Sequence, residues 1–415
     1  MSEWKEVVLG DLVTKITKGT TPPKGKGFAE SEGINYIKSD AIEYDGTVDQ
    51  KKFVLIDKET HEKFKRSQLE EGDILFSMAG NYLGKSGIVT KEMLPANTNQ
   101  ALAIIRLKQN LALPQYIGYC FRQPNMIRYV NSMSAQSAQP NINFQEIGSL
   151  FINLPEIGEQ KQIINVLGNL DQKITLLREQ NQTLEELAQT LFKRWFVEFE
   201  FPNENGQPYK SSGGTMVESE LGEIPEGWEI KPLSSIANYL NGLACQKYPV
   251  VNDEEKLPVL KIKELGNGIN DNTDWATSNV DEKYIIESGD MIFSWSGTLM
   301  LKIWDGERCV LNQHLFKVTS NAFPDWFIFQ WTNFHLNHFI AVAKSKATTM
   351  GHIKRSHLDE AMCFVPTREI FNHCNGAFAK ILESFKNNNQ EIQSLTQLRD
   401  TLLPKLMSGE LRVKE

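Results

Sequence analysis

Two polar loops carry the side chains best suited to recognise an extended polar ligand. Residues 136–143 are rich in Gln, Asn and Ser, and residues 346–355 are rich in Thr, Lys and Arg. Gln, Asn, Lys and Arg pair with the edges of adenine and guanine, and Ser and Thr bind phosphates. Either loop alone could be an ordinary polar turn. Together, as different loops ahead of matching strand-like segments, they favour a reader of two different stretches of nucleic acid.

Further candidates lie in a basic Gly- and Pro-rich loop at residues 18–27 and in the polar pair at 81–82. A region without any Asp or Glu, residues 93–145, adds a local basic surface to a chain of net charge -8. The candidate nucleic-acid contacts are Lys18, Thr20, Thr21, Lys24, Lys26, Asn81, Tyr82, Gln136, Ser137, Gln139, Asn141, Asn143, Lys344, Lys346, Thr348, Thr349, His352, Lys354 and Arg355.

Enzyme-like patterns are weak. Residues 79–86 approach a phosphate-binding loop around Lys85, but Ala79 replaces the first glycine and a strand-like segment follows where the motif needs a helix. The seven His and five Cys show no metal-ligand spacing. We therefore expect a non-catalytic chain without its own cofactor or metal, and a nucleotide hydrolase using Lys85 ranks as a minor alternative.

The elements that would position these loops are two long helices. Residues 163–195 form an unbroken heptad seam without Pro, and a helix of about 40 residues spans roughly 60 Å. A second seam follows 211 residues later, so we expect an antiparallel pair of helices. Asn181 and Asn388 help to fix the register if they meet polar partners, and the alternative is that both face solvent and have no effect. The predicted seam consists of Leu167, Leu170, Ile174, Leu177, Asn181, Leu184, Leu191, Phe378, Ile381, Phe385, Asn388, Ile392, Leu395 and Leu402.

The chain repeats itself in order. Trp228 follows Trp4 by 224 residues, and the Gly-Asp motif at Gly289 follows that at Gly72 by 217. A repeated framework with shortened loops explains the shrinking offset. The expected organisation is a recognition domain at 1–154, a helix at 155–200, a linker at 201–220, a second domain at 221–365, and a helix with a tail at 366–415.

Three local expectations accompany this organisation. The linker lacks apolar periodicity and is expected to be mobile. Pro404 is expected to stop or kink the second helix, because proline removes a backbone donor and clashes with the preceding turn. The start of that helix is left open, since Thr367-Arg-Glu369 replaces the Glu159-Gln-Lys161 of the first. The charged N-terminus and the lack of a long apolar run predict a cytoplasmic chain without membrane contact.

An ordered set of motifs resembles a known family. The set includes Leu221-Gly-Glu-Ile-Pro-Glu-Gly-Trp228, the paired Gly-Asp and Asn-Gln motifs, Gln139-Pro-Asn-Ile142, and Leu402-Leu-Pro-Lys-Leu-Met-Ser-Gly-Glu-Leu411. Together they resemble the specificity subunit of a type I restriction-modification enzyme. The resemblance covers essentially the whole chain.

The resemblance implies an α/β fold: two repeated α/β target-recognition domains joined by two long antiparallel helices with pseudo-twofold symmetry. It also implies that each domain reads half of an interrupted site in double-stranded DNA, and that the helices set the gap. The expected partners are two modification subunits holding S-adenosylmethionine, and motor-nuclease subunits using ATP and Mg²⁺. The rival interpretation is a coiled-coil adaptor with two protein-binding domains. Salt-dependent binding to duplex DNA distinguishes the two.

Overall fold

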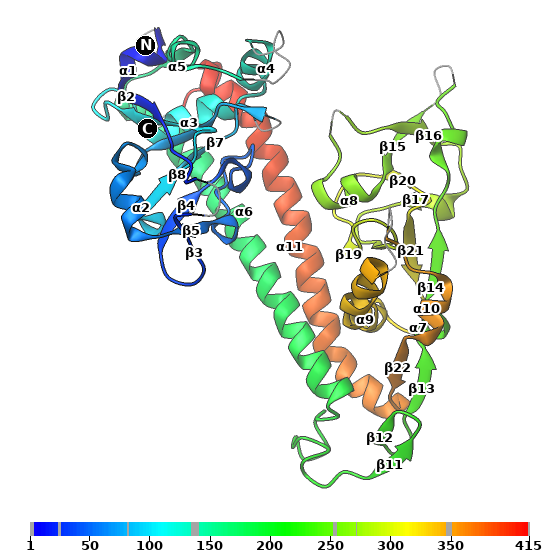
Figure 1. The fold of residues 1–415 in the computed structure, drawn as a ribbon. Helices are drawn as coiled ribbons and strands as arrows, with labels where there is room; N and C mark the ends of the chain where they lie inside the picture. The colour runs from blue at the N-terminus through cyan, green and yellow to red at the C-terminus, as the bar shows by residue number, and fades with distance from the viewer. Residues whose placement is uncertain are drawn as a thin grey trace. The chain divides into compact units, whose positions relative to one another are not determined.

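The chain forms two compact units, each an α/β domain with segments of two long helices. The computed structural model describes residues 4–23, 26–80, 83–133, 141–251, 255–270, 272–345 and 351–413. Unit 1 comprises Met1–Lys173 and Thr396–Glu415, and unit 2 comprises Ile174–Leu395. The long helices are α6 (Ile157–Phe192), which continues into a π-helical turn at Lys193–Val197, and α11 (Arg368–Ser408) (Figure 1).

Unit 1 is built on two four-stranded sheets. The main sheet has the antiparallel order β2 (Val13–Lys18), β9 (Leu102–Leu107), β6 (Ile74–Ser77), β7 (Ser86–Ile88). The second has the order β3 (Phe28–Ala29), β5 (Val54–Ile56), β4 (Ile34–Ile37), β8 (Ala96–Thr98), with β4 and β8 parallel. A short pair joins β1 (Lys5–Val8) to β10 (Phe151–Leu154). The α-helices are α1 (Leu9–Leu12), α2 (Lys58–Lys63), α3 (Pro114–Arg122), α4 (Pro124–Met133) and α5 (Phe144–Gly148).

Unit 2 repeats this plan. Its main sheet has the antiparallel order β14 (Asn238–Asn241), β21 (Leu315–Thr319), β18 (Met291–Ser294), β19 (Met300–Ile303). Its second has the order β16 (Trp275–Thr277), β15 (Lys256–Leu260), β20 (Cys309–Leu311), β17 (Ile285–Ile286), with β15 and β20 parallel. β13 (Glu229–Pro232) pairs with β22 (Met362–Val365), and β11 (Met216–Ser219) with β12 (Gly222–Pro225). The α-helices are α7 (Leu233–Ile236), α8 (Ile262–Asn267), α9 (Asp325–Ser345) and α10 (Arg355–Glu360).

The matching strand orders confirm the predicted duplication. The main sheets agree strand for strand, and the second sheets share one parallel and one antiparallel pairing. They differ at the outer strand. Unit 2 has β17 where unit 1 has only an isolated bridge between Gln68 and Asn97, and unit 1 adds β3 on the opposite side. An added edge strand leaves the inner framework unchanged, so the two domains share one fold.

The central strand β6 is buried throughout and its first three residues are apolar, because both of its faces are covered. Ile74 and Phe76 pack with α3, while Leu75 packs toward the second sheet. In unit 2, Phe293 packs with α9 and Ile292 toward the second sheet. A strand buried on both faces reads as a continuous apolar run rather than an alternating one.

The repeated Gly-Asp motif is a turn that starts this central strand. Gly72 has φ of 83° and Gly289 has φ of 98°, a left-handed conformation that glycine adopts without strain. The next residue, Asp73 or Asp290, accepts a hydrogen bond at 2.8 Å from the backbone N–H three residues earlier. Asp73 also pairs with Arg106 and Asp290 with Lys317, both at 2.7 Å. The motif therefore has a structural role in both domains.

Segments of α6 and α11 run antiparallel within each unit. In unit 1, Asp171 of α6 pairs with Arg399 of α11 at 3.1 Å, and Glu159 of α6 pairs with Arg412, just beyond the end of α11, at 3.7 Å. In unit 2, Asn181 contacts Asn388 and Asn389, and Trp195 packs against Phe378 with ring centroids 5.6 Å apart. In both units, later residues of α6 meet earlier residues of α11.

The expectation of a mobile linker was wrong. Residues 201–220 include β11, and Phe201 is only 2% exposed because its ring stacks on Trp228 and Tyr209. The lack of apolar periodicity in residues 201–220 reflects turns rather than mobility. The packing of Phe201 against Trp228 and Tyr209 is enough to order the segment.

Of the two outcomes expected at Pro404, a stop or a kink, the structure excludes the stop. α11 begins at Arg368 and continues through Pro404 to Ser408. Leu403, Leu406 and Met407 are buried in the core of unit 1. Their burial, worth about 1.5–3 kcal/mol for each fully buried side chain, offsets the hydrogen bond that proline cannot donate.

We predict that Pro404→Ala stabilises the chain by about 1–3 kcal/mol, because alanine restores the backbone donor and proline is about 3 kcal/mol less favourable in a helix interior. Urea unfolding followed by far-UV circular dichroism measures this difference. Lys405→Ala, at the next exposed position, is the matched control and should change stability little. A lower stability for Pro404→Ala would show that the packing of Leu403 and Leu406 depends on the proline.

Candidate nucleic-acid interface

In unit 1, three separate segments meet beyond the end of the main sheet. The turn at residues 99–102 leads into β9, and the carbonyl of Ala101 accepts a hydrogen bond from Met78 N–H at 2.8 Å. The carbonyl of Met78 in turn accepts from Ile142 N–H at 2.9 Å, and Asn141 forms a bridge with Ala79. The polar loop that precedes α5 therefore lies beside the Asn-Gln turn.

Unit 2 has the same arrangement. The carbonyl of His314, in the turn at residues 312–315, accepts from Trp295 N–H at 3.4 Å. The carbonyl of Trp295 accepts from Ile353 N–H at 3.0 Å, and His352 forms a bridge with Ser296. We call this end of each domain its loop edge. It comprises residues 18–21, 78–80, 99–102 and 141–143 in unit 1, and 241–243, 295–297, 312–315 and 351–353 in unit 2.

A glycine brings a fourth segment to each loop edge. Gly19 N–H donates to Leu102 O at 3.2 Å, and Gly242 N–H donates to Leu315 O at 3.1 Å. A Cβ on Gly19 would lie 2.1 Å from Thr98 O, and one on Gly242 would lie 2.4 Å from Asn312 O. Glycine is therefore required at both positions. It holds the end of β2 or β14 against the turn.

Unit 2 carries aromatic and imidazole groups at its loop edge. Trp295 Nε1 donates to Asn241 Oδ1 at 3.1 Å, and Ser296 Oγ lies 3.1 Å from His314 Nδ1. The Trp295 ring centroid is 5.9 Å from that of His314 and 6.3 Å from that of His352. Sequence reasoning selected His352 and missed Trp295 and His314. Both residues directly follow a repeated motif, Phe-Ser for Trp295 and Asn-Gln for His314, and this position could have identified them as candidates.

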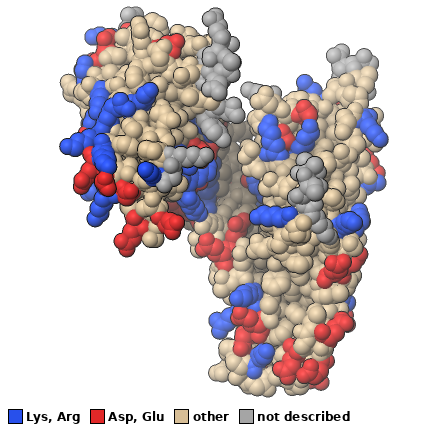
Figure 2. Space-filling view, in the orientation of Figure 1, with Lys and Arg blue, Asp and Glu red and all other residues tan. Residues whose placement is uncertain are grey.

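Several predicted contacts lie on or beside the loop edges with exposed side chains. They are Lys18, Thr21, Asn141, His352 and Lys354; Thr20 is half-buried, while Lys26 is exposed in its loop and Lys344 on the last turn of α9. Figure 2 also shows Lys and Arg side chains gathered on unit 1 around α2, with acidic side chains beside them. Predicted contacts outside the described residues are Lys24, Asn81, Tyr82, Gln136, Ser137, Gln139, Lys346, Thr348 and Thr349.

The predicted contacts Asn143 and Arg355 have side chains that stabilise their own domains. Asn143 caps α5, and its Oδ1 accepts from the backbone N–H groups of Gln145 and Glu146 at 2.9 and 3.0 Å. The Arg355 guanidinium donates to Tyr239 O at 3.3 Å and lies 5.8 Å from the centroid of the Phe316 ring. Both side chains thus stabilise the elements that carry the loop edges.

Every predicted seam residue is buried or half-buried. Asn181, 7% exposed, donates through Nδ2 to Asn389 Oδ1 at 2.6 Å and accepts from Asn388 Nδ2 at 2.9 Å. The structure thus places Asn181 against Asn388 and also against Asn389, which sequence reasoning missed. A buried amide tolerates only alignments in which it finds partners, so this contact favours one register of the helices.

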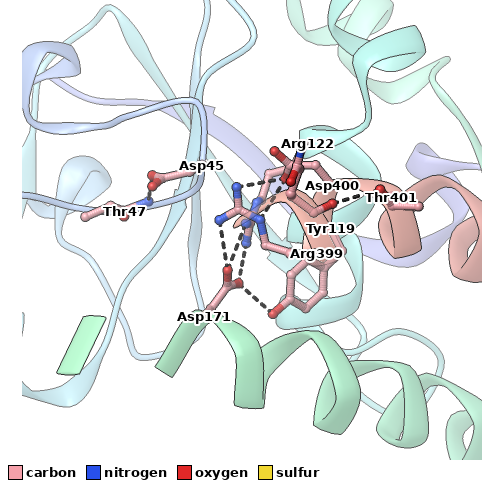
Figure 3. A network of polar contacts seen from close by, with 9 residues as sticks. Asp45, Thr47, Tyr119, Arg122, Asp171, Arg399, Asp400 and Thr401 are labelled. Atoms are coloured by element: carbon pink, nitrogen blue, oxygen red, sulfur yellow. Dashed lines mark hydrogen bonds and ion pairs between the residues drawn. The ribbon is translucent and has the colours of Figure 1, made fainter. Parts of the chain in front are cut away.

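Asp171 on α6 joins three elements of unit 1 (Figure 3). Its carboxylate accepts from Tyr119 and Arg122 of α3 at 2.9 and 2.7 Å, and from Arg399 of α11 at 3.1 Å. Burial alone would raise the pKa of Asp171, but hydrogen bonds and charge from Arg122, Tyr119 and Arg399 outweigh it and lower the pKa. The contact fixes both helices to the first domain.

Lys85 is engaged in an ion pair within the first domain. Its side chain is buried, and its Nζ lies 3.0 Å from Glu43 Oε2 and 5.0 Å from the centroid of the Tyr44 ring. Burial would raise the pKa of Glu43, but contacts with Lys52 and Lys85 outweigh it and lower the pKa. The charge of Lys85 is thus balanced within the domain.

The described part of the chain contains no group of three or more His, Cys, Asp or Glu arranged to hold a metal ion. The five cysteines are free and buried. Among the described helices, none combines the length and apolar character that crossing a membrane requires.

The family model described as Type I restriction modification DNA specificity domain matches residues 1–186 and 225–398. The chain belongs to this family. It is a type I specificity subunit with two target-recognition domains, one in each unit. The adaptor interpretation is not favoured.

Known relatives and a solved structure agree with this assignment. The chain is 28% identical over 339 residues to the MjaIX specificity subunit of Methanocaldococcus jannaschii, covering 79% of this chain and 76% of the relative. It is 24% identical over 480 residues to the HindI specificity subunit of Haemophilus influenzae, covering 99% and 100%. The fold is similar to the S subunit from M. genitalium, with a TM-score of 0.54, 14% identity, and 97% and 96% of the two chains covered.

We predict that Asp171→Asn destabilises the chain by roughly 3 kcal/mol at neutral pH, because it removes the carboxylate that the partly buried Arg122 and Arg399 share and leaves Arg399 only the exposed Asp400. The Arg122 and Arg399 side chains are only 11% and 9% exposed. Denaturant unfolding measures the effect. Asp400→Asn is the matched control: this carboxylate also pairs with Arg399 but is 57% exposed, so its loss should cost less than about 1 kcal/mol.

The difference between wild type and Asp171→Asn should depend on pH. Because the pKa of Asp171 is lowered in the folded state, its contribution is fully present above the ordinary aspartate pKa of about 3.9. The contribution is then lost as the pH falls from that value through the lowered pKa, where neutral Asp resembles Asn. A difference in stability that stays constant through this range would contradict the role given to the carboxylate.

Proposed function

We propose that the two target-recognition domains read the two halves of a bipartite asymmetric site in duplex DNA. The observation that carries this proposal is the pair of loop edges: the same four segments meet in both domains, but their side chains differ. A shared frame presents each edge to DNA in the same way, and different side chains select different bases. Belonging to a DNA specificity family supports this use of the edges.

Contacts with DNA phosphates would come from a few basic side chains rather than from the overall charge of the chain. The chain carries a net charge of -8, so attraction must come from basic groups such as Lys18 at the first loop edge and Lys354 beside the second. Each phosphate contact releases counterions, and binding should therefore weaken steeply with salt. Equilibrium binding of fluorescent duplexes between roughly 50 and 200 mM salt tests this. Failure to bind duplex DNA even at the low end of this salt range would instead support a protein-binding adaptor.

We propose a non-catalytic role for the chain within a larger enzyme. The best candidate catalytic side chain, Lys85, is held in an ion pair by Glu43. Base modification would then require two modification subunits carrying S-adenosylmethionine, and cleavage would require motor-nuclease subunits using ATP and Mg²⁺. The two long helices are the proposed docking elements for the modification subunits.

We also propose that the helices set the gap between the half-sites. The register contacts lie at two separate positions along each helix: Asp171 with Arg399 in unit 1, and Asn181 with Asn388 in unit 2. A change of helix length between these contacts alters the length of the helices without disturbing either contact.

We predict that seven residues inserted after Leu177 and seven after Ile392 lengthen each helix by about 10 Å, or about three base pairs. Both insertion points lie between the two register contacts, so each contact can re-form. Sequencing of methylated DNA from cells that make the chain with its modification subunits reads out the site. The half-site sequences should be unchanged, and the gap should grow by about three base pairs.

Insertion after Leu177 alone is the control. It shifts one helix by a heptad relative to the other, so Asp171 and Asn181 cannot both keep their partners, and stability and methylation should fall. An unchanged gap with persisting methylation in the double insertion would exclude the helices as the spacer.

A further inference from the structure

The two loop edges can be compared position by position, because the same backbone hydrogen bonds occur in both. Ala101 and His314 each accept from the residue that follows the central strand, which is Met78 in unit 1 and Trp295 in unit 2. Ala101 is therefore equivalent to His314, and Met78 to Trp295. The repeated frame accepts small or flexible apolar side chains at these positions, so the fold does not require the aromatic and imidazole groups of unit 2.

At two further equivalent pairs of positions, the two units also carry different side chains. Asn141 and His352 occupy matching bridges, and Lys18 and Asn241 precede the required glycines. Other positions do not vary: Gln100 in unit 1 matches Gln313 in unit 2, at the same corner of the turn. Some loop-edge positions therefore carry the same residue in both units, and others carry different residues.

In unit 2 the variable side chains form one cluster. Trp295 bonds to Asn241 at 3.1 Å, and its ring contacts those of His314 and His352. Trp295 stacks on Phe316 with ring centroids 5.8 Å apart and an interplanar angle of 29°. The Arg355 guanidinium lies over the same Phe316 ring, so it supports the cluster through Phe316.

The cluster borders a polar groove of about 510 Å³. Gln313 and His314 line it together with Lys261 and Asp274, which form an ion pair. Trp275, on its rim, is 45% exposed, and Lys256 Nζ lies 4.8 Å from the centroid of the Trp275 ring. Donors, acceptors and an aromatic surface therefore occur together at the turn that carries His314.

We infer that Asn241, Trp295, His314 and His352 determine which bases unit 2 selects in duplex DNA. The inference rests on the proposed function, and it adds the residues through which the second domain reads its half-site. Imidazole, indole and amide groups donate to or accept from base edges, whereas Ala101 and Met78 at the equivalent positions of unit 1 offer only apolar contact. Gln100 and Gln313, identical in both units, make contacts common to the two half-sites.

The test is an exchange between equivalent positions. His314→Ala and Trp295→Met place in unit 2 the residues that the same frame already accommodates in unit 1. The recognised site is first mapped by sequencing methylated DNA from cells that make the wild-type chain with its modification subunits. Purified full-length variants, bound to the same modification subunits, are then titrated with duplexes that carry single base substitutions in either half-site.

Both variants should lose discrimination in one half-site only, by roughly ten-fold or more per lost base contact. Ala101→His should alter discrimination in the other half-site. Gln313→Ala should weaken binding to all duplexes by a similar factor. His338→Ala, an exposed histidine on α9 away from the loop edge, is the matched control and should leave discrimination unchanged.

Unchanged discrimination in both half-sites for His314→Ala and Trp295→Met, or an equal loss in both, would overturn the inference. Melting curves identify a variant that fails to fold, and in that case His314→Gln, which keeps a polar side chain at the turn, should shift rather than abolish the preference in the same half-site. A wild-type chain that directs no bipartite methylation would instead refute the proposed function.

Discussion

The structure depends on the register of two helices that belong to one chain. An apolar seam alone is compatible with several alignments, because leucines a heptad apart are interchangeable. Polar groups in the seam remove this freedom, since a buried amide or charge without a partner costs about 1–3 kcal/mol or more. Asn181 in unit 2 and Asp171 in unit 1 each meet partners on α11 in the observed alignment. Asp171 also bonds to α3, which ties the register of the helices to the first domain.

The internal duplication separates residues that build the fold from residues to which the proposed function assigns specificity. Gly72 and Asp73, with their counterparts Gly289 and Asp290, recur because the turn into the central strand needs a left-handed residue and an acceptor for a backbone N–H. Gly19 and Gly242 recur because no Cβ fits between the strand and the turn. Residues that recur for such reasons cannot distinguish one DNA half-site from another. The positions free to differ at the loop edges are those that lie beside this frame.

Much of the fold could be predicted from the sequence, because its signals are periodic or repeated. The heptads around Asn181 and the Gly-Asp pairs need no knowledge of distant contacts. Residues 201–220 were misjudged because Phe201 is ordered by Trp228, a contact that no local pattern reports. The helix was expected to stop or kink at Pro404 because proline is unfavourable inside a helix. The burial of Leu403 and Leu406 beside it outweighs that preference. At the candidate site, loop composition pointed to the polar loops but missed Trp295 and His314, which three segments bring together in space.

A single chain with two domains can read a site that a symmetric homodimer cannot. In a homodimer the two reading surfaces are identical, so the bound site is a palindrome. Here the duplication places both surfaces in one sequence, where a change at His314 is not copied to Ala101. The frame that presents the two edges stays the same, because its glycines and aspartates are constrained by backbone geometry. The side chains on the edges can therefore diverge independently, and under the proposed function covalent linkage of two copies of one fold would give an asymmetric site.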